Sequence, residues 1–146
     1  VRGLDSKLYL ENTVMLSDGT IEVSNKDGIF SINGPNSSMT SDNINITGEN
    51  IDGQFSTINE NREVIKLNVK DEKISNIKTN DVDMYANKAI YDKKNSIIEL
   101  FENVKVIRGN EIITGDYGTL DTDTNSYKVK SNNSNKVKVI ITENNE

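Results

Sequence analysis

An all-β fold is predicted for this chain of 146 residues by three features of its sequence. Apolar residues recur at every second position, which is typical of strands with one dry and one wet face. Groups of Gly, Asn and Asp separate these runs at intervals of roughly 8–12 residues, the spacing found in sandwiches, jelly rolls and meandering sheets. No window of about eleven residues shows the 3.6-residue period of an amphipathic helix.

The N-terminal quarter predicts paired short strands. Thr20-Ile21-Glu22-Val23 shows the alternation clearly, and the turn groups Ser17-Asp18-Gly19 and Lys26-Asp27-Gly28 separate one run from the next. The segment from Asn33 to Asp42, with Gly34-Pro35, is expected to be a polar loop. The expected strands are 7–10, 13–16, 20–24 and 28–32.

The rest of the chain continues the same pattern. Val64-Ile65-Lys66-Leu67-Asn68-Val69 is the clearest central run, and Asp52-Gly53 is read as a turn. Asp81 to Asp92 comes nearest to a helical period, but it also fits two strands joined at Ala86-Asn87. The expected strands are 43–47, 54–58, 64–69, 74–79, 82–86, 88–92, 96–101, 104–108, 111–115, 117–121, 126–130 and 136–142.

An internal repeat is suggested by a shift of ninety residues without gaps. The shift places Leu10 on Leu100 and Gly19 on Gly109, with matching parity between these positions. Alternating sequences also align with one another by chance, so a chance match is the alternative. We expect one domain over residues 1–146, with repeated units at about 8–31 and 98–121 that stack into an extended sheet.

Composition argues against several functions. The chain has no His and no Cys, which removes catalytic triads, thiolate nucleophiles and most transition-metal sites. Asp121-Thr122-Asp123 lacks the further ligands of a calcium loop and is read as a hairpin turn. A net charge of −6 argues against a nucleic-acid partner. We therefore expect no enzyme activity, no metal and no cofactor.

A family resemblance is carried by the C-terminal part of the chain. Ala89-Ile90-Tyr91-Asp92, then Leu100-Phe101-Glu102-Asn103-Val104-Lys105-Val106 and Ile113-Thr114-Gly115-Asp116, follow the recurring unit of the OstA-like family. This family of periplasmic lipopolysaccharide-transport proteins is typified by LptA and LptC. Glu102 stands where the family usually has Gly. The match covers residues 86–143 well and residues 8–31 more weakly.

The resemblance implies an open, folded-over antiparallel sheet, called a β-taco or β-jellyroll, over the whole chain. It also implies a non-enzymatic periplasmic carrier that holds the acyl chains of lipid A, the lipid part of lipopolysaccharide, in an apolar groove. Such a carrier bridges inner- and outer-membrane transport components, its other Lpt partners. An LptA-like role is favoured. The alternative is an LptC-like component, whose membrane anchor or signal segment this fragment, beginning at Val1, would lack.

A second class of function is a structural or adhesive β-module that binds polysaccharide. Few aromatic residues are available to stack on sugar rings, since the chain has five Tyr, three Phe and no Trp. The inside of the sheet discriminates the two classes. A carrier needs space between its inner faces, whereas a structural sandwich fills that space to interior density.

The groove lining is predicted from apolar residues that occupy matching positions in the two repeat units. Their neighbours along the strand, Met15, Glu22, Lys105 and Ile107, are expected to face outward. A charge at Val106 should then block lipid binding while an open groove leaves the fold intact. The predicted lining is Leu10, Val14, Leu16, Val23, Leu100, Val104, Val106 and Ile113.

The two ends of the sheet are expected to pair head to tail. An open sheet leaves unpaired backbone groups at both edges, and this chain protects them with little beyond lysines. Acidic Asp5 and Glu11 lie near one end, and Lys136 and Lys138 near the other. The resulting contact does not close on itself and yields chains. The predicted edge residues are Leu8, Leu10, Val137, Val139 and Ile141.

Overall fold

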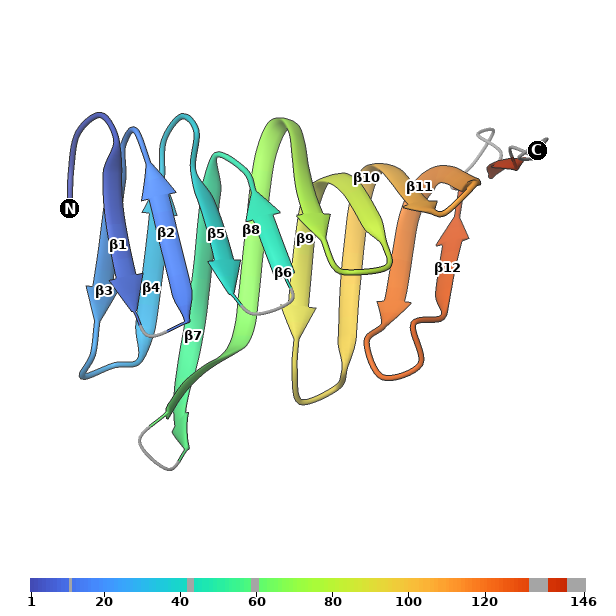
Figure 1. The fold of residues 1–146 in the computed structure, drawn as a ribbon. Helices are drawn as coiled ribbons and strands as arrows, with labels where there is room; N and C mark the ends of the chain where they lie inside the picture. The colour runs from blue at the N-terminus through green and yellow to red at the C-terminus, as the bar shows by residue number, and fades with distance from the viewer. Residues whose placement is uncertain (11, 42–43, 59–60, 132–136, 142–146) are drawn as a thin grey trace.

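The computed structural model describes residues 1–10, 12–41, 44–58, 61–131 and 137–141. The described residues form one antiparallel sheet of thirteen strands and contain no helix (Figure 1). The all-β, folded-over prediction is confirmed. The strands are β1 Ser6–Leu10, β2 Thr13–Ser17, β3 Thr20–Ser24, β4 Ile29–Asn33, β5 Ser38–Ser41, β6 Ile44–Thr47, β7 Asn50–Ile58, β8 Asn61–Lys78, β9 Asp83–Asp92, β10 Ile97–Arg108, β11 Glu111–Asp121, β12 Tyr127–Lys130 and β13 Lys138–Ile141.

The sheet folds over itself into two layers. Layer A contains β1, β2, β5, β6 and β13, and layer B contains β3, β4, β7 and β12. The long strands β8 to β11 run through both layers, because one part of each pairs in layer A and the other part in layer B. We call the fold line the spine and the opposite side, where the hairpins of the two layers face each other, the mouth. The spine is the upper side of Figure 1.

Each long strand bends where it crosses the spine. The pairing register shifts between Lys70 and Ser75 in β8 and between Phe101 and Val104 in β10. The sequence predicts each of these long strands as two short ones, and the predicted breaks at 70–73, 87, 102–103 and 116 fall at these bends. Strand periodicity therefore located the corners of the fold, although it did not show that the chain stays hydrogen-bonded through them.

Side-chain hydrogen bonds connect the strands along the spine. The hydroxyls of Ser17 and Ser37 lie 2.9 Å apart. The Asn87 amide donates to the carbonyls of three β8 residues, Asp71, Glu72 and Lys73, at 3.0 Å each. Its oxygen accepts a 2.6 Å hydrogen bond from Asn103 of β10. The three bonds to β8 satisfy carbonyls that its bend removes from the sheet ladder.

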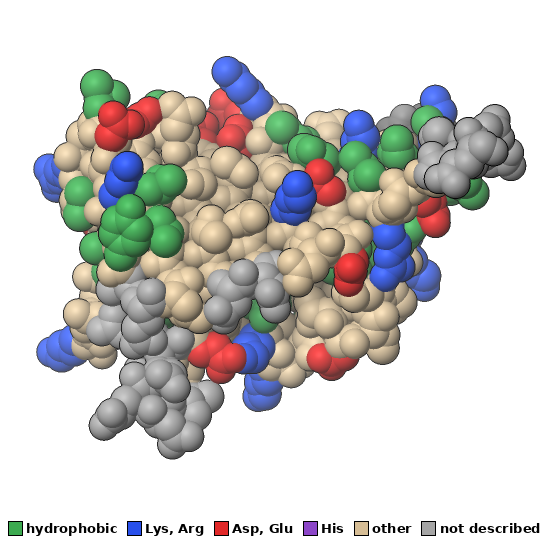
Figure 2. Space-filling view, viewed as in Figure 1, with side chains coloured by type: hydrophobic (Ala, Val, Ile, Leu, Met, Phe, Trp, Pro, Cys, Tyr) green, Lys and Arg blue, Asp and Glu red, His purple; other side chains and the backbone are tan. Residues whose placement is uncertain are grey.

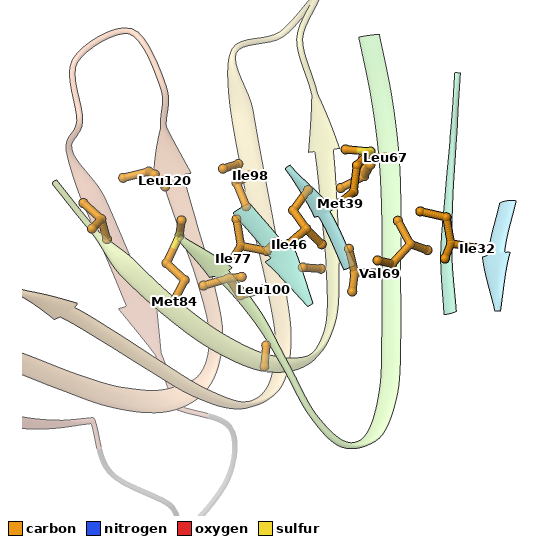
Figure 3. Packing of buried hydrophobic residues seen from close by; sticks show 14 of the residues in the cluster. Ile32, Met39, Ile46, Leu67, Val69, Ile77, Met84, Ile98, Leu100 and Leu120 are labelled. Carbon is orange, nitrogen blue, oxygen red and sulfur yellow. The ribbon is translucent and has the colours of Figure 1, made fainter. Parts of the chain in front are cut away.

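The core consists of apolar rows that run across the strands on the inner face of each layer. Figure 3 shows side chains of the two layers packed against one another. The layer A row is Leu8, Met15, Met39, Ile46, Ile77, Met84, Val106, Ile113 and Val139. The layer B rows are Val23, Phe30, Gly53, Leu67, Tyr91, Ile98, Leu120 and Tyr127, and, nearer the spine, Ile21, Ile32, Ile51, Val69, Ala89, Leu100, Gly118 and Val129.

The predicted orientation of β2 is wrong. Met15 is fully buried in the core, so Val14 and Leu16 lie on the opposite, outer face of layer A. The inner positions beside Met15 are the polar residues Thr13 and Ser17. Thr13 donates to the Ser41 hydroxyl at 3.1 Å, and Ser17 donates to a backbone carbonyl at 3.0 Å. Because these hydroxyls are hydrogen-bonded, burying them is tolerated.

The structure also corrects the expected loop and the expected repeat. Residues 38–41 form β5, although Met39 is the one apolar residue there. Gly19 lies at the spine between β2 and β3, whereas Gly109 lies in the β10–β11 hairpin at the mouth. The two aligned glycines therefore occupy different places in the fold and do not mark equivalent positions of two structural units.

The sequence predicts a turn at Gly53, but this residue lies inside β7. The Phe30 ring occupies the position that a Cβ at Gly53 would take. A Cβ at Gly53 would meet the ring of Phe30 and would lie 2.8 Å from the Lys66 carbonyl oxygen. Glycine in a strand interior marks such a close approach. The strand therefore continues through a residue that sequence rules assign to a turn.

Replacing Glu102 with glycine is expected to stabilise the fold by about 0.5–1 kcal/mol. Glu102 and Asn103 form the β10 bend with φ angles of 66° and 53°, in the left-handed region that favours glycine. Glycine relieves this strain, at some entropic cost in the unfolded chain. Urea denaturation monitored by circular dichroism measures the change. Ala in place of Glu102 is the control and is expected to give no gain, so equal stabilisation by both variants would contradict the backbone explanation.

Candidate functional site

A cavity of about 440 Å³ lies between the two layers at the mouth. This volume is within the range of roughly 300–1,000 Å³ typical of ligand pockets. Its inner wall is apolar: Met39 and Ile46 come from layer A, and Leu67, Ile98 and Leu120 come from layer B. Each of these side chains is at most 1% exposed, so the packed rows of the core form the floor of the cavity.

The rim of the cavity is polar. Asn80 and Asp81 follow β8 in layer A, and Thr122 and Asn125 follow β11 in layer B. Glu63 and Lys93 form an ion pair on the layer B side, with both side chains about 40% exposed. A pair this exposed contributes little to stability. Apolar walls below a hydrated rim suit a ligand with an apolar tail and a polar group that stays in water.

The mouth is bridged at the C-terminal end of the cavity. The Asn125 amide donates to the Asp81 carboxylate at 3.1 Å, which joins layer B to layer A. Next to it, the Arg108 guanidinium of layer A lies over the Tyr127 ring of layer B, 5.3 Å from its centroid. Burial and a hydrogen bond to Glu111 raise the pKa of Tyr127 to about 12, so its hydroxyl is a neutral donor at neutral pH.

The structure describes the side chains of seven of the eight predicted lining residues and places none of these seven in the cavity wall. Leu100, Val104 and Val106 are buried in the core, and Val23 packs against it. Ile113 continues the Val106 row and is partly buried. Glu22, Lys105 and Ile107 alternate with inner residues and face outward, as predicted. The side chain of Leu10 lies outside the described part of the structure.

Much of the actual wall comes from a part of the chain that the predicted repeat does not cover. Ile44 and Ile46 of β6 and Val64 and Leu67 of β8 supply much of it. Period two places Ile44 and Ile46 on one face of β6, as the sequence indicates. In β8 a shift in register at Ile65 brings Val64 to the same face as Leu67, which period two does not predict. The sequence did not show that these inner faces border an open space, or that in β10 Ile98 borders it while Leu100, Val104 and Val106 do not.

The outer face of layer A carries apolar side chains near each end. Figure 2 shows one group over β1 and β2 and another over β10 and β11, with a largely polar surface between them. Tyr9 is 67% exposed, and Val14 and Leu16 are half-buried beside it. Val14 and Leu16, predicted as groove lining, therefore belong to an exterior surface.

The predicted edge residues lie on or beside terminal strands of layer A. Leu8 and Leu10 belong to β1, the first strand of the layer, and Val139 and Ile141 belong to β13, the last. Val137 directly precedes β13 and is exposed. Among the predicted charges, Glu11 and Lys136 lie outside the described residues. In layer B, Arg2 forms a β-bridge with Thr20 and partly covers the edge of β3.

Two further searches cover the described residues. No group of three or more acidic side chains there lies close enough together to hold a metal ion. Within the same ranges, no helix reaches the length and hydrophobicity needed to cross a bilayer.

A folded-over antiparallel sheet with apolar inner rows and a cavity at its mouth defines the β-jellyroll, or β-taco, class of proteins. The chain belongs to the LptA/(LptD N-terminal domain) LPS transport protein family, whose sequence model matches residues 20–126. The family resemblance seen in the sequence is thereby confirmed.

The fold is similar to a solved structure of the same class. This is LptH of Pseudomonas aeruginosa, described as the LptA-homologous periplasmic component of the lipopolysaccharide transport device. The match covers 90% of this chain and 95% of LptH, with a TM-score of 0.71 and 14% sequence identity. No curated protein sequence matches the chain.

Proposed function

We propose that this protein is a non-enzymatic periplasmic carrier of lipopolysaccharide that holds lipid A acyl chains in the cavity at the mouth. The observation that carries the proposal is the cavity itself, because a sandwich with a purely structural role would fill this space with side chains. Family membership supports lipopolysaccharide as the cargo. An LptA-like bridge needs two ends that can pair with other transport components, and β1 and β13, the first and last strands of layer A, could supply them.

The chemistry of the cavity supports an acyl chain as the bound group. Each methylene transferred from water to an apolar wall contributes about 0.8 kcal/mol, without requiring a directional partner. The wall contains uncharged, apolar side chains, so a bound hydrocarbon leaves no wall charge without a partner. These side chains are Met39, Ile46, Leu67 and Ile98. The polar rim leaves the head group in water, so the ligand does not have to be fully enclosed.

Site-specific photo-crosslinking tests the proposal. Ile44 lines the cavity, whereas its neighbour Asn45 is exposed on the outer face of layer A. A benzoylphenylalanine photoprobe at Ile44 is expected to crosslink purified lipopolysaccharide, and the same probe at Asn45 is the matched control. The readout is the crosslinked band detected with an antibody against lipopolysaccharide. Equal crosslinking from both positions, or crosslinking from Asn45 alone, would contradict the proposed site.

A further inference from the structure

One group of contacts bridges the mouth at the C-terminal end of the cavity. Asp81 lies between β8 and β9, Arg108 and Glu111 flank the β10–β11 hairpin, and Asn125 and Tyr127 lie at the β11–β12 turn. We call these five residues the clasp. Asp81 and Asn125 also line the cavity, so the clasp begins where the cavity ends.

The apolar interior continues under the clasp. Met84 and Val106 continue the layer A row beyond the cavity wall, and in layer B the wall residue Leu120 is followed by Tyr127 of the clasp. Met84 and Val106 are 1% and 2% exposed and do not line the cavity, so their side chains close it at this end. A hydrocarbon chain lying along these rows can advance past the cavity only if the two layers separate at the clasp.

The clasp contacts are of a kind that can open and close. Asp81 is exposed and Asn125 is half-buried, so water can replace their hydrogen bond at little net cost. The Asn125 turn keeps its shape independently, because its backbone N–H donates to the Asp121 carbonyl at 2.8 Å. Breaking the Asp81–Asn125 bond therefore removes one link of the clasp without unfolding either hairpin, and the Arg108–Tyr127 contact is the link that remains.

From this arrangement we infer that the clasp gates sideways loading of the cavity. When the clasp opens, the hairpins of the two layers separate at the mouth and an apolar chain enters between them. The chain then extends beneath Asp81 and Asn125 toward the C-terminal end of the sheet. When the clasp closes, the chain is retained. This inference rests on the proposed carrier function and adds the route of entry and the residues that control it.

A reversible crosslink across the mouth tests the gate. The chain has no cysteine, so an introduced pair is the only target of a thiol-specific reagent. Asp81→Cys is combined with Thr124→Cys, because a cysteine at Asn125 would be strained by its φ of 59°. A bis-methanethiosulfonate reagent joins the pair, and a reductant releases it. The control pair is Thr119→Cys with Lys128→Cys, which are cross-strand partners within layer B.

The measurement is the rate at which the protein takes up dansyl-labelled dodecanoic acid, followed by stopped-flow fluorescence. Crosslinking across the mouth is expected to slow uptake about tenfold or more, as for a closed lid, and reduction is expected to restore the rate. Crosslinking the control pair is expected to leave the rate unchanged. Uptake at an unchanged rate in the crosslinked Asp81–Thr124 variant would overturn the gate. Failure of the reduced protein to bind the probe at all would instead overturn the carrier function, and the gate with it.

A second variant opens the clasp instead of locking it. Asn125→Gly removes the amide donor while retaining a backbone that accepts positive φ. We expect faster uptake and faster release of the same probe, with unchanged unfolding in urea. Asn95→Gly is the control. Asn95 lies in the β9–β10 turn, and its amide donates a hydrogen bond to Asp92 of the same hairpin, so it does not bridge the mouth. Equal kinetics for Asn125→Gly and the parent would overturn the role of the Asp81–Asn125 contact.

Discussion

Replacing Val106 with aspartate is expected to unfold the protein and not merely to block a groove. The sequence suggested an open groove at this position, but Val106 is 2% exposed and lies between Met84 and Ile113 in the inner row of layer A. Its cross-strand partners, Met84 and Ile113, offer neither a charge nor a hydrogen-bond donor. An unpaired carboxylate buried there costs several kcal/mol, against a total stability of about 5–15 kcal/mol.

Urea denaturation followed by far-ultraviolet circular dichroism checks this expectation. Lys105→Asp is the matched control, because Lys105 is the next residue on the same strand and faces outward. Its ammonium lies 6.0 Å from the Tyr85 ring centroid, so its loss is expected to cost about 1 kcal/mol or less. A folded Val106→Asp variant with nearly parental stability would show that the inner row is not packed as described.

Placing charges on the last strand of layer A is expected to abolish growth of head-to-tail chains. Val139 and Ile141 of β13 are 52% and 69% exposed, although they share the inner face with buried residues farther along the sheet. We propose that a second copy covers them through its β1 edge, where Leu8 lies on the inner face. Aspartates at Val139 and Ile141 oppose this contact, because each would lose its hydration without gaining a partner.

Light scattering over a concentration series distinguishes the outcomes. The parent chain is expected to increase in mass with concentration, because a heterologous contact does not close on itself. The double variant, and a chain without residues 136–146, are expected to stay monomeric. Ile74→Asp is the control, because Ile74 is 40% exposed on β8, away from both ends of the sheet. A parent that stays monomeric, or a double variant that grows like the parent, would contradict edge pairing.

Period-two alternation determined much of the architecture from the sequence alone. Alternation makes one face of each strand apolar, and a sheet with one apolar face must bury it against another surface. The interruptions in that pattern at Asn87 and Glu102-Asn103 marked the bends at the spine. The residues that resemble the OstA-like family lie in β9, β10 and β11, next to these bends. Their spacing identified the family.

The face of β2 and the place of the cavity were decided by the tertiary structure. Hydropathy favours Val14 and Leu16 as inner residues, but hydroxyl partners on β5 and at the spine let Thr13 and Ser17 be buried, which turns Met15 inward. One strand's sequence does not contain these partners. The cavity depends likewise on how far the two layers approach at the mouth, where hairpins distant in sequence, such as those of Asp81 and Asn125, meet. Local periodicity specifies which residues face inward in most strands, whereas the space left between two inner faces depends on all the side chains that meet there.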